Sequence, residues 1–267
     1  MNPKTWLHVS LFFWPELAQA WPLHFGTNEI SPGQIIQFTV PLNARARSEA
    51  SPLGHGGEFA RGALVLPAGF DLRKPCPLLI VSVPSGGSAI GMIRAYTNMA
   101  WREGWAVLAG DGPRVPAEQD TIQLGWAMLS SVLDHATKTW PPMKQWPVAC
   151  AGFSGGAKRS AAVGAAMAKE GFRVIGIFMG GCNEDRATLG FQLFRPGEPF
   201  KNVPLFLSNG TQDPIANPQH AAAVRASMEQ NGFKRIRAEA YDGSHGLDEA
   251  QLRLALQWFK QLAEVRR

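Results

Sequence analysis

The chain alternates between short apolar runs and longer segments whose apolar residues are spaced as on one face of a helix. The run at 78–83 is rich in β-branched and aliphatic residues, which is typical of a strand buried on both faces of a parallel sheet. Strands are predicted at 34–40, 63–66, 78–83, 106–109, 148–151, 174–179, 205–208 and 236–241. Helices are predicted at 92–103, 121–137, 157–169, 220–231 and 248–265, and a loop at 43–57.

This alternation of strands and helices predicts an α/β fold. Right-handed crossovers would build a mostly parallel sheet with helices on both faces. The 267 residues are enough for one large domain with a sizeable core, and no internal repeat or linker divides the sequence. A single domain over 21–267 is therefore expected. The segment 182–203 is too short to form a large cap domain over it.

The composition indicates a folded protein without a nucleic-acid partner. Hydrophobic residues make up 45% of the chain and charged residues 18%, which is typical of globular proteins. The net charge of +5 is scattered rather than gathered into a basic patch. Lys158 and Arg159 form one small basic pair, for which a solvated helix face is expected rather than binding of an acidic substrate.

The N-terminus has the pattern of an export signal. Lys4 precedes a largely apolar run at 6–14, and Ala18-Gln19-Ala20 fits the small-x-small cleavage pattern. Cleavage after Ala20 would give an exported protein, periplasmic or secreted. The alternative is an apolar arm packed on the domain of a cytoplasmic protein. The run is too short to span a bilayer as a helix, so stable membrane insertion is not expected.

The three cysteines give no metal or disulfide pattern. Their odd number leaves no complete intramolecular framework, and no C-x-x-C spacing suggests zinc. A disulfide that involves Cys76 or Cys182 stays open, whereas Cys150 is expected to be a buried residue of a strand. We expect neither a metal nor a cofactor, and the oligomeric state is not determined by the sequence.

The pentapeptide Gly152-Phe153-Ser154-Gly155-Gly156 joins a predicted strand to a predicted helix. This is the context of a G-x-S-x-G nucleophile elbow, in which a strained Ser is exposed at the tip of a tight turn. Side chains at Gly152 or Gly156 would clash with neighbouring backbone. The alternatives are an ordinary glycine-rich turn and an anion site at the start of the helix.

Two further reactive side chains follow later strands. Asp213 comes after the strand at 205–208, and His245 comes after the strand at 236–241. Ligands of α/β sheets bind at the carboxyl ends of the strands, so Ser154, Asp213 and His245 are expected to meet there. Their order along the chain is the order of a Ser-Asp-His hydrolase triad. Glu184 and Asp185, after the preceding strand, are alternative candidates for the acid.

These motifs resemble those of α/β-hydrolases of the esterase type. From about residue 61 to the C-terminus the chain is similar to small carboxylesterases and to polyhydroxybutyrate-depolymerase-like or feruloyl-esterase-like proteins. The resemblance rests on residues 77–81, 152–156, 209–213 and 243–245. It implies an α/β-hydrolase fold and a serine hydrolase that cleaves carboxylic esters through an acyl-enzyme. A small-molecule or polysaccharide-linked ester would be the substrate.

The sequence departs from this family after the third strand, where such esterases often have His-Gly. Here the position holds Pro84-Ser85-Gly86-Gly87, and the His55-Gly56-Gly57 motif lies too early in the chain to replace it. An oxyanion hole needs only backbone N–H groups. We therefore expect Gly155 and one residue of the 85–88 loop, preferably Gly86 or Gly87, to form it.

Two other function classes stay open. A serine peptidase would use the same three residues, and a non-catalytic binding protein could share the scaffold. The aromatic residues of the 182–203 segment are predicted to pack in the core rather than to line a substrate pocket. They are Phe191, Phe194 and Phe200.

Overall fold

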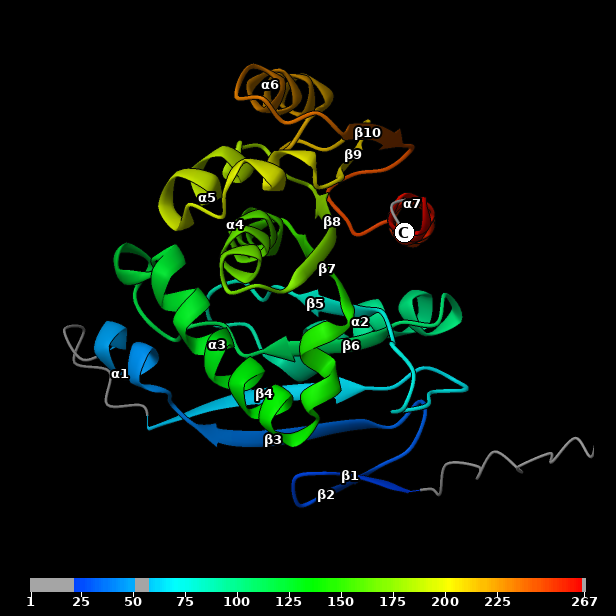
Figure 1. The fold of residues 1–267 in the computed structure, drawn as a ribbon. Helices are drawn as coiled ribbons and strands as arrows, with labels where there is room; N and C mark the ends of the chain where they lie inside the picture. Colours follow the sequence, from blue (N-terminus) through cyan, green and yellow to red (C-terminus); the bar gives the residue numbers. More distant parts are fainter. Residues whose placement is uncertain (1–21, 51–57, 266–267) are drawn as a thin grey trace, which may run out of the picture.

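The computed structural model describes residues 22–50 and 58–265. The predicted signal peptide and the His55-Gly56-Gly57 motif lie outside these residues. In the described part of the chain, eight strands form one sheet with the order β10-β9-β8-β7-β5-β6-β4-β3 (Figure 1). The strands are β3 (Ile35–Pro41), β4 (Phe59–Val65), β5 (Leu78–Val81), β6 (Ala106–Gly110), β7 (Pro147–Phe153), β8 (Arg173–Gly180), β9 (Leu205–Gly210) and β10 (Ile236–Tyr241).

The sheet is parallel from β6 to β10, and β3 and β4 extend it as an antiparallel edge. The mostly parallel sheet is thus confirmed, and each predicted strand overlaps an observed one. The sequence of β5 is continuously apolar because its successive residues point to opposite faces of the sheet and both faces are buried. Leu78 and Ile80 enter the core on one face, whereas Leu79 and Val81 enter the core on the other.

Helices cover both faces of the sheet, as Figure 1 shows. Helices α2 (Ala89–Arg102) and α7 (Glu249–Glu264) pack on one face through residues such as Ile93 and Phe259. The other face carries α1 (Ala44–Ala50), α3 (Ile122–Thr139), α4 (Gly155–Lys169), α5 (Arg186–Phe194) and α6 (Pro218–Gln230). None of the helices in the described residues is both long and apolar enough to cross a membrane.

The loop predicted at 43–57 is wrong for residues 44–50, which form α1. Asn43 caps this helix by accepting the N–H of Ala46 at 2.8 Å, and its amide donates to Ser130 and Asp134 of α3. Ala46 and Ala50 are buried. Helix α1 is short and contains Arg and Ser residues, so its apolar face is hard to recognise in the sequence. The helix is stabilised by packing against α3.

A small antiparallel hairpin of β1 (Leu23–Phe25) and β2 (Asn28–Ile30) was not predicted from the sequence. Between β8 and β9 lie only α5 and a short 3-10 helix at Glu198–Asn202, so no large cap domain covers this part of the sheet. Core packing of its aromatic residues is confirmed. Phe200 is buried, and Phe191 and Phe194 are partly buried against the same core.

Candidate active site

Ser154 lies at the turn between β7 and α4, as the motif predicted. Its backbone has φ 53° and ψ −119°, a conformation that residues with a Cβ rarely adopt. The N–H of Ser154 donates to the carbonyl of Gly180 on β8 at 2.8 Å, and its own carbonyl accepts the N–H of Ala157 in α4. The strand on one side and the helix on the other therefore hold the serine in a strained conformation.

Gly152 and Gly156 are required by close packing of the backbone around this turn. A Cβ on Gly152 would lie 2.1 Å from the carbonyl oxygen of Gly156. A Cβ on Gly156 would lie 2.5 Å from the carbonyl oxygen of Ser82, just after β5. Both distances are far below a van der Waals contact, so the predicted reason for these glycines is confirmed.

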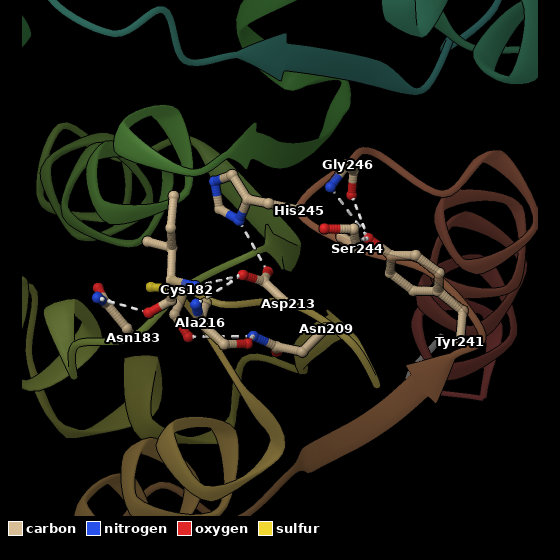
Figure 2. Close-up of polar contacts among 10 residues, drawn as sticks. Cys182, Asn183, Asn209, Asp213, Ala216, Tyr241, Ser244, His245 and Gly246 are labelled. Atoms are coloured by element: carbon tan, nitrogen blue, oxygen red, sulfur yellow. Dashed lines mark hydrogen bonds and ion pairs between the residues drawn. The ribbon is translucent and has the colours of Figure 1, made fainter.

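Asp213 is buried in the loop after β9, with 2% of its surface exposed. Its Oδ1 accepts the N–H groups of Ile215 and Ala216, each at 2.8 Å, and its Oδ2 lies 2.7 Å from Nδ1 of His245 (Figure 2). Burial by itself would raise the pKa of Asp213. The hydrogen bonds from Ala216, His245 and Ile215 outweigh burial and hold this pKa below its ordinary value.

His245 lies in the loop after β10, and its ring is placed beside the serine turn. The ring centroid is 4.7 Å from that of Phe153, the residue before Ser154. Gly181, after β8, leaves room for the imidazole ring, because a Cβ on this residue would lie only 2.9 Å from Cε1 of His245. With Nδ1 directed at Asp213, the ring turns Nε2 away from the carboxylate (Figure 2).

The two alternative acids do not contact His245. Glu184 forms ion pairs with Lys158 and Arg186, and the hydrogen bond from Lys158 is the main reason why the pKa of Glu184 is lowered. Asp185 caps α5 by accepting the N–H of Thr188 at 3.0 Å. The structure therefore places Asp213, and neither of its rivals, against the imidazole.

The loop 82–88 packs against the serine turn, since a Cβ on Gly155 would lie 3.3 Å from Cβ of Pro84. The predicted preference for Gly86 or Gly87 as an oxyanion donor needs correction. The N–H of Gly86 already donates to Pro113 at 2.9 Å, and the N–H of Gly87 closes a turn onto Pro84 at 3.0 Å. Among the described residues, the N–H groups of Ser85 and Gly155 have no acceptor.

Arg159 is not on a solvated helix face, so that expectation was wrong for this residue. Its side chain is 12% exposed and its guanidinium pairs with Asp120, which in turn contacts the hydroxyl of Ser85. Gly125 of α3 makes the space, because a Cβ there would lie 2.1 Å from Nη1 of Arg159. No local sequence pattern reveals this pair, which joins two loops and a helix behind Ser85.

The three cysteines are free and buried, which answers the open disulfide question for this structure. Burial raises the pKa of Cys76 and of Cys182 to about 11, and it raises the pKa of Cys150 as well. Within residues 22–50 and 58–265, no group of three or more His, Cys, Asp or Glu side chains is arranged to hold a metal ion.

Comparisons by sequence give no relatives: no family model matches the chain, and no curated protein matches it significantly. Solved structures do resemble it. An esterase from Pyrobaculum calidifontis has a TM-score of 0.60 at 14% identity, covering 88% of this chain and 87% of its own. Est1E from Butyrivibrio proteoclasticus has a TM-score of 0.54 at 16% identity, covering 78% and 96%.

A serine hydrolase from Xanthomonas campestris, described as having no lid, has a TM-score of 0.54 at 18% identity. The match covers 88% of this chain and 97% of that protein. Identities this low carry information about the fold alone. Together with the sheet order and the strand-turn-helix at Ser154, these likenesses show that the chain has the α/β-hydrolase fold.

Proposed function

We propose that this protein is a serine hydrolase that cleaves carboxylic esters, with Ser154 as nucleophile, His245 as general base and Asp213 as the acid of the triad. One observation carries the proposal. A fully buried carboxylate, held by two backbone N–H groups, lies 2.7 Å from the imidazole that flanks a strained serine turn. A turn built only for folding has no need of this combination.

In the proposed mechanism, Ser154 Oγ attacks the ester carbonyl while Nε2 of His245 takes the hydroxyl proton. Collapse of the tetrahedral intermediate breaks the bond to the alcohol, which receives that proton, and leaves an acyl-enzyme. Water then attacks the acyl-enzyme with the same base, and the acid product and Ser154 are released. Asp213 keeps the proton of His245 on Nδ1 and stabilises the imidazolium.

The negative oxygen of the intermediate would be bound by the N–H groups of Gly155 and Ser85. Both are backbone donors without another acceptor, and Pro84 lies close enough to Gly155 that a Cβ there would come within 3.3 Å of Cβ of Pro84. The largely covered ion pair of Asp120 and Arg159 contacts the hydroxyl of Ser85. Removal of one such donor typically raises the barrier by about 3 kcal/mol.

Esters are favoured over peptides as substrates by the likeness to esterases. One Est1E structure is described with ferulic acid bound, and another similar structure is a ferulic acid esterase. A putative dipeptidyl aminopeptidase also shares the fold, but this chain covers only 35% of it. We therefore propose a small-molecule or polysaccharide-linked ester, and aromatic acyl groups belong in the substrate panel.

The test is labelling by a fluorophosphonate together with hydrolysis of short acyl, feruloyl, acetyl-sugar and peptide substrates. Ser154→Ala should abolish labelling and lower hydrolysis by several orders of magnitude, because triad members act as a unit. Ser227→Ala is the matched control, since the hydroxyl of Ser227 on α6 donates to Asp185, the N-cap of α5, and to no residue of the proposed triad, so both readouts should stay unchanged. Wild-type turnover by Ser154→Ala would reject the nucleophile, and cleavage of peptides alone would reject the ester class.

We further propose that residues 1–20 direct export. The supporting pattern is the basic residue, apolar run and small-x-small site of the sequence. Mass spectrometry of the mature protein should then find Trp21 at the N-terminus. An intact Met1 on protein from the cytosol would contradict export without affecting the proposed chemistry.

A further inference from the structure

Tyr241 is the last residue of β10, and its side chain folds back over the loop that carries His245. Its hydroxyl oxygen lies 2.8 Å from the carbonyl oxygen of Ser244 and 2.5 Å from that of Gly246, and it accepts the N–H of Gly246 at 3.2 Å. Figure 2 shows the phenolic oxygen beside Ser244 and Gly246, the two sequence neighbours of His245. One phenolic oxygen thus contacts the residue before the histidine and the residue after it.

The geometry of this contact limits how the loop can move. A phenol has one proton to donate, so it bonds one of the two carbonyls at a time while accepting from Gly246. Gly243 allows the ring to approach, because a Cβ there would lie 2.8 Å from Cε2 of Tyr241. The chain from Tyr241 to Gly246 thus closes on itself through the Tyr241 hydroxyl, and His245 is one of the residues within this closed loop.

The first half of the same loop is held by the Asp213 loop. The N–H of Gln212 donates to Gly243 at 2.9 Å, and the N–H of Thr211 donates to Tyr241 at 2.9 Å. A Cβ on Gly210 would lie 2.3 Å from the carbonyl oxygen of Gly243, so the two loops touch along their backbones. These contacts fix Asp213 against residues 241–243, and the hydroxyl of Tyr241 fixes the part that bears the imidazole.

We infer that the Tyr241 hydroxyl is a positioning group for His245, which it holds at the distance and angle needed to reach both Asp213 and Ser154. This inference rests on the proposed function. Tyr241 acts through the loop backbone and does not touch the reacting atoms. A base must keep its geometry to within a fraction of an ångström while it exchanges a proton with two partners, and a misplacement of about 1 Å costs about 100-fold in rate.

The test is Tyr241→Phe, which keeps the ring and removes only the hydroxyl. The chain supplies a matched control, because its one other tyrosine, Tyr96, is fully buried and its hydroxyl has no partner in the described structure. For Tyr241→Phe we expect kcat, per site titrated with fluorophosphonate, to fall about 10- to 100-fold with KM within twofold. Tyr96→Phe should keep the wild-type kcat.

A spectroscopic measurement separates positioning from folding. The proton shared by His245 Nδ1 and Asp213 should give a low-field proton resonance in the wild type and in Tyr96→Phe. In Tyr241→Phe this resonance should broaden or vanish through faster exchange, while the melting temperature shows that the protein is folded. An unchanged resonance and an unchanged kcat in Tyr241→Phe would overturn the inference. An activity loss matched by the loss of titratable sites would also overturn it, since it would show a merely structural role.

The outcome can be separated from the proposed function. If the wild type neither hydrolyses esters nor reacts with the fluorophosphonate, the proposed function fails. The resonance still reports whether the hydroxyl of Tyr241 holds His245 against Asp213. If the wild type is active and Tyr241→Phe has the same kcat and the same resonance as the wild type, the proposed function stands and the inference fails.

Discussion

Replacing Ser154 by glycine and, separately, by alanine would measure the backbone strain at this proposed nucleophile. Both variants lack the hydroxyl, so both should lose ester hydrolysis and fluorophosphonate labelling. They differ in the Cβ atom, which at φ 53° and ψ −119° is crowded by the adjacent backbone. A residue with a Cβ in such a conformation typically costs about 1–3 kcal/mol.

Glycine relieves this strain but loses more chain entropy on folding, which costs about 0.4–1 kcal/mol relative to alanine. The two effects leave Ser154→Gly more stable than Ser154→Ala by about 1 kcal/mol or slightly more. In a protein of this size, 1 kcal/mol shifts the melting temperature by about 2–4 °C. The glycine variant should therefore melt about 2–4 °C above the alanine variant.

Differential scanning calorimetry of the two variants under identical conditions checks this order. Ser227, inside α6, supplies a control pair of opposite sign. There glycine should be less stable than alanine by about 1 kcal/mol, because an ordinary helical position favours alanine. If Ser154→Gly melted at or below Ser154→Ala while the Ser227 pair behaved as stated, the fold would not strain the backbone at Ser154.

Four other results are expected. Gly156→Ala should lower turnover, and it should lower the free energy of unfolding by about 1–3 kcal/mol, because the added Cβ would lie 2.5 Å from the carbonyl oxygen of Ser82. Enzyme kinetics and calorimetry measure the two effects, and a fully active variant would contradict the close packing at Gly156. Asp213→Asn should lower kcat about 10⁴-fold through the wrong histidine tautomer, whereas Glu184→Gln and Asp185→Asn should change it less than tenfold; the reverse pattern would reassign the acid. Because the pKa of Asp213 is lowered, the stability that its carboxylate contributes should be complete above about pH 4 and should disappear as the pH falls through the lowered pKa. The free energies of unfolding of the wild type and Asp213→Asn, measured with denaturant, should therefore converge in acid. The three buried thiols should react with a thiol reagent only after unfolding, and rapid reaction of the native protein would contradict their burial.

The sequence by itself determined the layered α/β architecture. Strands buried on both faces must be apolar at nearly every position, so runs such as 78–83 stand out without knowledge of their neighbours. The serine turn is local in part: Gly152 is needed because of the nearby carbonyl of Gly156, whereas Gly156 is needed because of Ser82, which follows the neighbouring strand β5. The chain order of Ser154, Asp213 and His245 was visible for the same reason, since each follows a recognisable strand.

Only the tertiary structure decided which partners these residues have. Asp213 and His245 are 32 positions apart, and the parallel register of β9 and β10 brings their loops together. The choice of Ser85 over Gly86 depends on a bond to Pro113, in the loop after β6. No local pattern encodes such contacts, because hydrogen bonds between loops depend on strand order and loop path rather than on propensity.

The same reason explains the features that the sequence concealed. The α1 helix gains its stability from α3, and the ion pair of Arg159 and Asp120 depends on space left by Gly125. The contact of Tyr241 with both flanks of His245 exists only once β10 ends beside that loop. Apolar periodicity reports burial one element at a time, whereas polar geometry is set by elements that meet only in the folded chain.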